Sequence, residues 1–513
     1  MTGNASDWFV DRHVREGRSE KVAFREASGR SRQLSFGELA EATDNVAGAF
    51  NRAGQRAEER AAMIVLDQIE FPEIFWGALK AGVVPVPINT LLGTDVYRAI
   101  LTDSRATSLF VSEELWPVVG PAVPDCPALD RVIFIPAAEG AATPDGTMAY
   151  TDFLAGAEPR KGVDRSGDEV AFWLYSSGST GQPKGVRHVH SALRETAQTY
   201  GAQVLGIAED DTIYSVAKLF FAYGLGNGMT FPMSVGATAV LFNGRPTPDV
   251  VSEILAAERP TIFCGVPTLY AALLHHWEGA PRPDAPIRLS ISAGEALPAK
   301  IGKAWQGHWG GDILDGVGST EMLHIFLSNR ADDIVYGTSG IAVPGYDLRL
   351  VNEDGADCAE GEIGELLVRG GSGAQDYWNQ RGKSRATFEG EWTRTGDKYE
   401  RDASGRYIYC GRTDDMFKVS GIWVSPFEVE QALASHPSVL EAAVVAHRDA
   451  DGLEKPRAFI VLKAPLDNHE AVLKEHIKDA IGKWKYPRWI EVVDDLPKTA
   501  TGKIQRFKLR DGA

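Results

Sequence analysis

The run YSSGSTGQPKG, residues 175–185, has the residue types that bind phosphate. Its glycines let backbone N–H groups approach an anion closely, its hydroxyls add donors, and Lys184 adds a positive charge. A Walker loop needs glycine, four residues and then Gly-Lys-Ser/Thr at the start of a helix. Here Pro183 precedes the lysine and Gly185 follows it, so the run predicts a phosphate-binding loop of another kind.

Four further polar segments follow this run along the chain. They place carboxylates, hydroxyls and lysines next to glycines. A single run of this kind is more often a surface turn, so the interpretation depends on their number and order. They are DGVGSTE (315–321), WTRTGD (392–397), GRTDD (411–415) and PKTATGK (497–503).

The composition is ordinary for a globular enzyme. At 513 residues the chain predicts two or more domains, and 44% hydrophobic residues exclude a mainly disordered chain. The formal charge of −17 disfavours nucleic acid or an anionic membrane as a partner. Residues 471–513 nevertheless carry ten Lys or Arg against six Asp or Glu. This basic segment could receive an anionic small molecule, although a solvated face is the simpler interpretation.

The cysteines and the N-terminus bear on the compartment. The four cysteines form no CxxC pair and the polar N-terminus shows no signal peptide, so we expect a reduced, cytoplasmic protein without a metal cluster. Residues 219–242 contain no charged side chain and are long enough to cross a bilayer. Glycines and a proline interrupt them, however, which favours the buried wall of a pocket.

The first part of the chain alternates helix and strand patterns. Ser35 as N-cap, Glu38 three residues later and Gly54 at the end predict a helix, and residues 71–82 predict another. Short apolar strands separated by helices indicate doubly wound, largely parallel sheets with ligands at the strands' carboxyl ends. The loop at 175–185 fits that rule because it follows a strand directly. Strands are expected within 60–68, 83–90, 131–136, 170–178, 237–242, 261–267 and 288–296.

The pattern changes after about residue 340. Short strands joined by Gly and Asp turns predict a small antiparallel β subdomain. A compact α/β pattern then resumes, in which residues 425–428 supply an N-cap, an N1 proline and an N3 glutamate, and Leu473 and Ile477 mark a later helix. We therefore expect a domain boundary at Asp414, which divides the chain into residues 1–413 and 414–513.

The five segments, in this order, resemble the adenylate-forming superfamily of acyl- and aryl-CoA synthetases, luciferases and nonribosomal-peptide adenylation domains. The resemblance covers essentially the whole chain. Within it, AKLFFAYGLGNGMTFPMSVGAT and DGVGSTEMLHIFLSN are similar to the benzoate- and 4-hydroxybenzoate-CoA ligases. It implies an α/β fold, with a large N-terminal domain of doubly wound, mostly parallel sheets plus a small β subdomain. A small, mobile α+β C-terminal domain follows.

The resemblance also implies a reaction in two halves that uses ATP, Mg²⁺ and coenzyme A. A carboxylate attacks the α-phosphorus of ATP and expels pyrophosphate, and the thiol of coenzyme A then displaces AMP from the acyl-adenylate. The carboxylate is already ionised at neutral pH and needs no general base. Because an anion must meet a polyanion, we expect catalysis by charge neutralisation and positioning.

The resemblance assigns the nucleotide site to particular residues. Glu321 is the expected Mg²⁺ ligand, since Mg²⁺ takes one or two carboxylates and otherwise phosphate oxygens and water, and Thr320 is expected at the α-phosphate. Asp397 is expected to accept both ribose hydroxyls, with Arg412 on the other side of the ribose. The β- and γ-phosphates are assigned to Ser176, Ser177, Gly178, Ser179, Thr180, Gly181 and Lys184. Adenine and its surroundings are assigned to Gly294, Glu295, Ala296, Asp315, Gly316, Val317, Gly318 and Ser319; Val317 stands where the superfamily commonly has a stacking aromatic residue.

Lys503 has the expected catalytic role in the first half-reaction. It would bridge the acid's carboxylate and the α-phosphate, and its loss should cost about 3–4 kcal/mol of barrier, by analogy with oxyanion-hole donors. Asp414 resembles the hinge about which the C-terminal domain rotates after adenylation. That rotation would bring Gly421 to the thiol of coenzyme A, where a side chain would obstruct a narrow tunnel. Lys418 and Ser420 belong to the same expected coenzyme A segment, and the basic residues Lys483, Lys485, Arg488 and Arg506 are candidates for binding the coenzyme A phosphates.

The acid pocket is expected to take benzoate or a monohydroxybenzoate. Flat aromatic walls suit a ring, a small residue leaves space for it, and His324 could orient the carboxylate or a ring substituent. A buried histidine that only packs in the core is the alternative for His324. The expected lining is Phe221, Ala222, Tyr223, Gly224, Ser292, Ala293, Gly294, Gly318, Ser319, His324 and Ile325.

Two other functions remain open at this level. The chain could load an aryl acid onto the phosphopantetheine of a carrier protein, although we expect no carrier domain after the last of the five segments. It could also be a sensor that keeps the nucleotide site without catalysis, which the presence of both Glu321 and Lys503 disfavours. We expect a monomer or homodimer that binds small molecules, with no nucleic acid or membrane partner.

Overall fold

The computed structural model describes residues 3–27, 31–138, 140–177, 183–279, 281–419, 422–449, 453–482, 485–498 and 504–511. The chain divides into two compact units. Unit 1 comprises Met1–Tyr336, Gly340–Asp347 and Val368–Thr393, and unit 2 comprises Gly337–Ser339, Leu348–Leu367 and Arg394–Ala513. Across the described ranges, none of the helices combines the length and the apolar character needed to cross a membrane.

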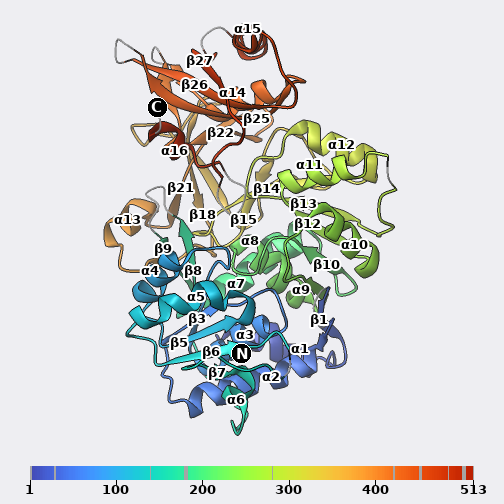
Figure 1. The fold of residues 1–513 in the computed structure, drawn as a ribbon, viewed down its shortest axis with the longest axis vertical. Helices are drawn as coiled ribbons and strands as arrows, with labels where there is room; N and C mark the ends of the chain where they lie inside the picture. Colours follow the sequence, from blue (N-terminus) through green and yellow to red (C-terminus); the bar gives the residue numbers. More distant parts are fainter. Residues whose placement is uncertain are drawn as a thin grey trace. The chain divides into compact units, whose positions relative to one another are not determined.

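A nine-stranded sheet forms the centre of unit 1 (Figure 1). Its inner strands are parallel, and the antiparallel strands lie toward its two ends. Both β13 and β14 end in predicted motifs, so the segments SAGEA and GSTE leave adjacent parallel strands at the same edge. In order, the strands are β16 (Ile341–Ala342), β15 (Ile325–Ser328), β14 (Ile313–Gly318), β13 (Leu289–Ser292), β12 (Ile262–Gly265), β10 (Thr212–Ser215), β11 (Thr238–Leu241), β1 (Val22–Glu26) and β2 (Gln33–Ser35).

Helices cover this sheet. α10 (Pro248–Glu258), α11 (Pro267–His276) and α12 (Ala299–Trp309) lie next to β12, β13 and β14 in Figure 1. Their apolar side chains and those of the strands form one core around Trp305, which stacks edge-to-face on Tyr270 with 4.7 Å between ring centroids. The short helices α7 (His190–Thr196), α8 (Ala222–Leu225) and α9 (Phe231–Val235) belong to the same unit. The uncharged stretch 219–242 therefore forms α8, a π-helical turn, α9 and β11, mostly buried.

A second sheet in unit 1 is entirely parallel. Its helices include α2 (Phe36–Arg52) and α3 (Glu70–Ala81), which pack on each other. The predicted capping box of α2 is present: Ser35 Oγ accepts from Glu38 N, and the Glu38 carboxylate accepts from Ser35 N. The strands are β4 (Val84–Pro87), β3 (Arg60–Ile64), β5 (Ser108–Ser112), β6 (Arg131–Ile135) and β7 (Met148–Ala149). Further helices are α1 (Arg12–Arg15), α4 (Thr94–Ser104), α5 (Trp116–Val119) and α6 (Tyr150–Leu154).

The strand before the predicted phosphate loop does not belong to a parallel sheet, contrary to our expectation. β8 (Val170–Ser177) and β9 (Pro183–Val189) form an antiparallel hairpin, with Ser176 opposite Lys184. The short strand β19 (Asp376–Tyr377) pairs with β9 and completes a three-stranded sheet. An apolar stretch before a glycine-rich loop looks the same in the sequence whether its strand is parallel or antiparallel to its neighbour. The pattern of apolar residues does not show which strand it pairs with.

Unit 2 contains the predicted β subdomain and the C-terminal α/β element. The subdomain is a five-stranded sheet: β17 (Asp347–Val351), β18 (Gly364–Arg369), β21 (Trp392–Arg401) and β20 (Phe388–Glu389) in order, with β22 (Tyr407–Arg412) also on β21. The part of this sheet within Val368–Thr393 belongs to unit 1, as does α13 (Arg381–Thr387). The hairpin β23 (Phe417–Val419) and β24 (Ile422–Val424) precedes a sheet of β25 (Val439–Arg448), β26 (Glu454–Leu462) and β27 (Trp489–Val492). α14 (Pro426–Ala434), α15 (His469–Ile481) and α16 (Arg506–Asp511) complete the unit.

The helix signals of unit 2 are confirmed. Ser425 caps α14 by accepting a hydrogen bond from Glu428 N at 3.0 Å, and Leu473 and Ile477 of α15 are buried in the core. The α/β fold class expected from the sequence is confirmed. The boundary at Asp414 stays a prediction, because the compact unit also includes part of the β subdomain.

Candidate functional site

Part of the predicted site lies outside the described residues. These positions are Gly178, Ser179, Thr180 and Gly181 of the phosphate loop, Ser420 and Gly421 of the coenzyme A segment, and the catalytic candidate Lys503. The side chains of Ser177 and Lys418 also lie outside the description, although both backbones belong to strands. The remaining site residues fall into three groups, two in unit 1 and one in unit 2.

The first group joins the phosphate-loop lysine to the predicted metal ligand. Lys184 Nζ lies 2.9 Å from Glu321 Oε1 and 3.0 Å from the hydroxyl of Tyr377, which itself lies 2.8 Å from Glu321 Oε1. The ammonium group also lies 4.3 Å from the centroid of the Tyr377 ring. These three polar groups therefore form a closed triangle.

Glu321 is held ionised in this triangle. Burial raises the pKa of its carboxyl, but Lys184 and the Tyr377 hydroxyl more than offset that effect, so the pKa lies below its ordinary value. For Lys184, burial lowers the pKa, and the charge of Glu321 reverses the direction. Both side chains thus carry their charges at neutral pH. Removing one partner would leave the other as a buried, unpaired charge.

The chemistry of this group fits Mg²⁺. No cluster of three or more His, Cys, Asp or Glu that could hold a metal occurs among the described residues. Mg²⁺ in nucleotide sites uses one or two carboxylates and takes its other ligands from phosphate and water, so a single buried carboxylate beside a phosphate-loop lysine suits it. Glu321 would hold the cation, whose charge would offset that of the nucleotide phosphates.

The turn that carries Glu321 has a strained backbone. Leu323 has a φ of 64°, a left-handed conformation that is unusual for a leucine. Ser319 Oγ accepts from Met322 N at 3.2 Å, and Glu321 O accepts from Ala374 N at 2.7 Å. This conformation persists because neighbouring segments fix both ends of the turn.

The second group begins three residues after Glu321, at His324. Its ring lies 5.8 Å from that of Tyr223 and 4.5 Å from that of Phe231, between centroids, and is buried. His324 Nε2 lies 3.3 Å from Tyr223 O. Burial lowers the pKa of His324 to about 3, so the imidazole is neutral, and a carbonyl partner requires its Nε2 to carry the hydrogen.

Two glycines make room for this histidine. A Cβ at Gly226 would lie 2.3 Å from His324 Cδ2, and one at Gly318 would lie 2.5 Å from His324 O. Tyr223 is fixed by its hydroxyl, which lies 3.1 Å from Gly265 O. Tyr223 of the predicted aromatic wall and His324 are therefore brought together, and Ile325 packs where a side chain at Gly316 would clash. The other predicted lining positions, Phe221, Ala222, Gly224, Ser292 and Ala293, lie on β13, α8 and the residues flanking them.

The predicted adenine segments adjoin each other at the same sheet edge. Asp315 on β14 lies opposite Ser292 at the end of β13, and its Oδ2 accepts from Leu297 N at 3.3 Å. Burial raises the pKa of Asp315 to about 8. Its Oδ1 has no hydrogen-bond partner among the described residues. The role assigned to Asp315, accepting from the adenine amino group, needs the ionised carboxylate and stays a prediction. Gly294, Glu295 and Ala296 precede Leu297, and Gly316, Val317, Gly318, Ser319 and Thr320 continue from Asp315.

The third group belongs to unit 2. Asp397 of β21 lies opposite Arg412 of β22, and Arg412 Nη1 donates to Asp397 Oδ1 at 2.9 Å. Arg412 Nη1 also lies 3.1 Å from Thr395 O. The structure therefore brings together the two side chains that were assigned to the ribose.

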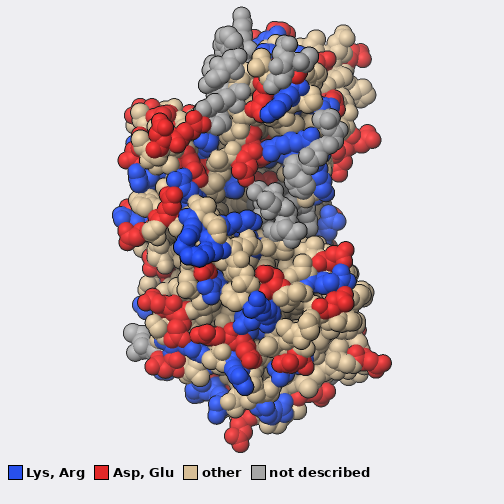
Figure 2. Space-filling view, turned by 90° about the vertical axis from the view of Figure 1, so that its left-hand side faces the viewer, with Lys and Arg blue, Asp and Glu red and all other residues tan. Residues whose placement is uncertain are grey.

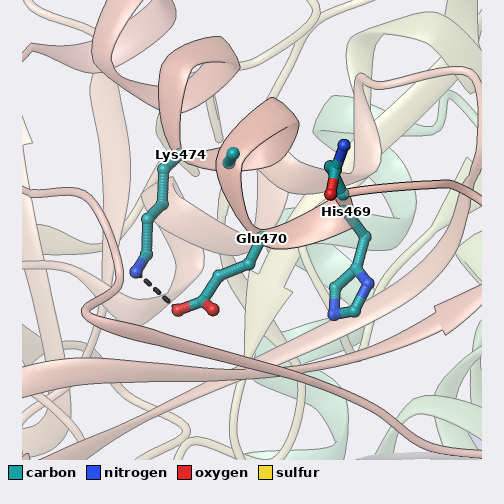
Figure 3. Close-up of a pocket in the computed structure, with 5 residues that line it drawn as sticks. His469, Glu470 and Lys474 are labelled. Atoms are coloured by element: carbon teal, nitrogen blue, oxygen red, sulfur yellow. Dashed lines mark hydrogen bonds and ion pairs between the residues drawn. The ribbon is translucent and has the colours of Figure 1, made fainter.

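The basic C-terminal segment is largely neutralised within unit 2. Lys485 pairs with Glu428, Lys498 with Glu441, and Arg506 with the buried Glu430. Acidic and basic side chains are interspersed on the molecular face in Figure 2, which shows no large patch of one sign. A hollow at the first turn of α15 is lined by Asn468, His469, Glu470, Ala471 and Lys474, and Lys474 pairs with Glu470 there (Figure 3). Lys485 and Arg506 are thus paired with acidic residues of the same unit, and the assignment of the basic segment to coenzyme A phosphates stays a prediction.

Tyr377 was missed by sequence reasoning. It lies in AQDYWNQ, which has no spacing that marks a ligand site. Its contacts with Glu321 and Lys184 span 56 and 193 residues of sequence, respectively. The segment GELLVRGG, a few residues before Tyr377, predicts a strand and does not indicate a ligand site nearby.

Two family models match most of the chain. The AMP-binding enzyme family model matches residues 10–378, and the AMP-binding enzyme C-terminal domain model matches residues 428–503. The chain is 52% identical to a 4-hydroxybenzoate–CoA/benzoate–CoA ligase of Rhodopseudomonas palustris, over 99% of this chain and 94% of that protein. It is 51% identical to a benzoate–CoA ligase of Thauera aromatica, over 99% and 95%.

Two solved structures extend the comparison. A benzoate CoA ligase from Burkholderia xenovorans superposes with a TM-score of 0.90 at 47% identity, covering 99% of both chains. An anthranilate CoA ligase in complex with anthranoyl-AMP superposes with a TM-score of 0.93 at 41% identity, covering 99% of this chain and 97% of that one. The chain therefore belongs to the AMP-binding, adenylate-forming enzyme family.

Proposed function

We propose that the protein is an AMP-forming aryl-CoA ligase acting on benzoate or a hydroxybenzoate. The carboxylate oxygen bonds to the α-phosphorus of ATP as pyrophosphate leaves, giving an aryl-adenylate. The sulfur of coenzyme A then bonds to the acyl carbon as AMP leaves, giving the aryl-CoA thioester. ATP and coenzyme A are thus the other two substrates, and Mg²⁺ is the cofactor.

One observation supports this function above the others. The turn that holds Glu321 against Lys184 runs directly into His324, whose neutral ring packs against Tyr223. The predicted metal ligand and a cluster of aromatic side chains are therefore three residues apart, which supports an acid pocket at this place and an aromatic acid presented to ATP. The ligases of R. palustris and T. aromatica are named for benzoate and coenzyme A, so loading of a carrier protein is not favoured.

Several finer parts of the proposal rest on sequence alone. Lys503 bridges the acid and the α-phosphate, and the C-terminal domain turns at Asp414 to exchange Lys503 for the Gly421 segment. Asp397 and Arg412 hold the ribose. We place the enzyme in the cytoplasm as a monomer or homodimer, where it acts in aromatic acid degradation.

The reaction is tested by measuring pyrophosphate release with a panel of benzoates, with and without coenzyme A. Pyrophosphate and AMP together with benzoyl-CoA or hydroxybenzoyl-CoA are the expected products. Formation of ADP, or release of pyrophosphate with aliphatic acids only, would contradict the proposal.

A further inference from the structure

Within the triangle the hydroxyl of Tyr377 lies between Lys184 and Glu321, and the chemistry of these two groups fixes the direction of its hydrogen bonds with them. Lys184 Nζ only donates and the ionised Glu321 carboxylate only accepts, so the Tyr377 oxygen accepts from Lys184 and its hydrogen points to Glu321 Oε1. Oε1 therefore receives two donors, one charged and one neutral. The hydrogen bond from the Tyr377 hydroxyl to Glu321 does not depend on the position of the Lys184 ammonium group.

The backbone around Tyr377 is anchored to the strand that carries Lys184. Tyr377 lies opposite Val186 in the β19–β9 pair, and its N–H donates to Ser384 Oγ at 3.1 Å. The preceding Asp376 forms a two-bond ion pair with Arg187, with both distances 2.6 Å. The Tyr377 side chain is itself only 4% exposed.

The same segment is anchored to the turn that carries Glu321. Ala374 N donates to Glu321 O at 2.7 Å, and Ser372 Oγ donates to Met322 O at 2.7 Å. Residues 372–377 therefore connect the strand after the phosphate loop with the turn of the predicted metal ligand. The Tyr377 hydroxyl is fixed relative to both.

We propose that Tyr377 is a positioning residue that keeps the Glu321 carboxylate directed at Mg²⁺ after Lys184 turns to the nucleotide phosphates. This inference rests on the proposed use of Mg·ATP. Without nucleotide, Lys184 neutralises Glu321. With nucleotide, the ammonium group has a more negative partner, and the phosphates repel the carboxylate. The Tyr377 hydrogen bond to Oε1 then holds the carboxylate in place and leaves Oε2 for the cation.

The test measures binding of the non-hydrolysable analogue AMPPNP by calorimetry, with Mg²⁺ and with EDTA. Tyr377→Phe removes the hydroxyl and keeps the ring. We expect its affinity for AMPPNP to fall roughly tenfold with Mg²⁺ and to stay unchanged in EDTA, since one hydrogen bond to a charged group is lost. Equal weakening under both conditions would overturn the proposal, because Tyr377 would then contribute to the nucleotide pocket without acting through the metal ligand.

A double-mutant cycle shows whether Tyr377 acts through Glu321. Glu321→Gln should remove the effect of Mg²⁺ on AMPPNP binding, and adding Tyr377→Phe should then change nothing further. An effect of Tyr377→Phe that persists in the Glu321→Gln background, or Mg²⁺-dependent binding that survives Glu321→Gln, overturns the inference. Tyr336→Phe is the matched control, because its hydroxyl donates to the Asp312 carboxylate at 2.8 Å outside the triangle. It should bind AMPPNP as the unchanged protein does.

The binding measurements need no aromatic acid, so they stand apart from the proposed reaction. If the acid panel yields no aryl-CoA while the Mg²⁺-dependent effect of Tyr377→Phe is present, the substrate assignment fails and the role of Tyr377 holds. If aryl-CoA forms but Tyr377→Phe weakens AMPPNP binding equally with Mg²⁺ and with EDTA, or still has its effect in the Glu321→Gln background, the role of Tyr377 fails and the proposed reaction stands.

Discussion

Asp397 and Arg412 face each other across the β21–β22 pair, and Arg412 Nη1 donates to Asp397 Oδ1 at 2.9 Å. Gly396 permits this arrangement, since it has a φ of 72° and a Cβ there would lie 2.9 Å from Arg412 Nη2. The carboxylate assigned to the ribose is therefore held by a neighbouring side chain of the protein. A carboxylate held in one position loses less conformational entropy when it binds a ligand.

The first prediction concerns this carboxylate. Asp397→Asn keeps the shape but weakens the acceptor for two ribose hydroxyls, so the KM for ATP should rise about tenfold or more, as for hydrogen bonds to a charged group. AMP binding measured by calorimetry should weaken in parallel. Asp357→Asn breaks an exposed ion pair with Arg349 in unit 2 and should change neither quantity. An unchanged KM for ATP in Asp397→Asn would contradict the ribose assignment.

Sequence reasoning succeeded where the signal was local. The capping box of α2 and the N-cap of α14 depend on residues three positions apart, and both are present. The parallel sheets also followed from strands alternating with helices. In each case the chain's own neighbours determine the structure, so a short stretch of sequence contains the information.

The errors and omissions arose from long-range contacts. The β8–β9 hairpin was taken for part of a parallel sheet because an apolar strand shows its burial and not its partner. Tyr377 was missed since its role depends on two residues distant in sequence. The ion pairs of Lys485 and Arg506 with Glu428 and Glu430 could not be predicted either, because a count of basic residues does not show which acidic side chains lie next to them in the fold.

The second prediction concerns the close approach of Gly226 to His324. In Gly226→Ala the new methyl group would lie 2.3 Å from Cδ2 and 2.5 Å from Nε2, so the imidazole must shift. We expect a KM for the aromatic acid raised at least about tenfold, since even small misplacements in a site are costly, with the KM for ATP little changed. Kinetics with each substrate varied in turn provide the measurement.

Gly307→Ala is the control for this substitution. Gly307 lies within α12, and a Cβ there meets nothing within 4 Å, so alanine should leave both KM values unchanged and favour the helix slightly. Equal effects of Gly226→Ala on both substrates would show that it disturbs the fold rather than the acid pocket.

The third prediction concerns stability at acid pH. Burial lowers the pKa of His188 to about 4, against about 6.5 in an unfolded chain, while the charge of Glu321 acts in the opposite direction. Between these values the unfolded chain binds a proton that the folded protein does not, so stability falls as pH decreases from 6.5 to 4. His188 should contribute a slope of about 1.4 kcal/mol per pH unit.

Unfolding temperatures of the protein and of His188→Gln, followed from pH 7.5 to 4.5, provide the measurement. The variant should lose less stability on acidification, relative to its own value at pH 7.5. His275→Gln, at an exposed helix end, should follow the original profile. Parallel profiles for the protein and His188→Gln would show that this histidine does not contribute to the acid sensitivity.

The last prediction concerns Asp415, which follows the proposed hinge. Its carboxylate pairs with Arg510 and lies 3.6 Å from Arg506, so it ties α16 to this part of the chain. α16 begins shortly after Lys503, and its Arg506 is fixed further by Glu430 at 2.6 Å. Asp415→Asn should therefore loosen the segment around Lys503. Because Lys503 is assigned to the first half-reaction only, pyrophosphate release should slow about tenfold, which corresponds to about 1.4 kcal/mol, while thioester formation from pre-made benzoyl-adenylate stays near its original rate.

Asp495→Asn, which breaks an exposed pair with Lys498, is the control and should alter neither rate. If Asp415→Asn slows both half-reactions equally, Asp415 controls the hinge itself rather than the placement of the lysine.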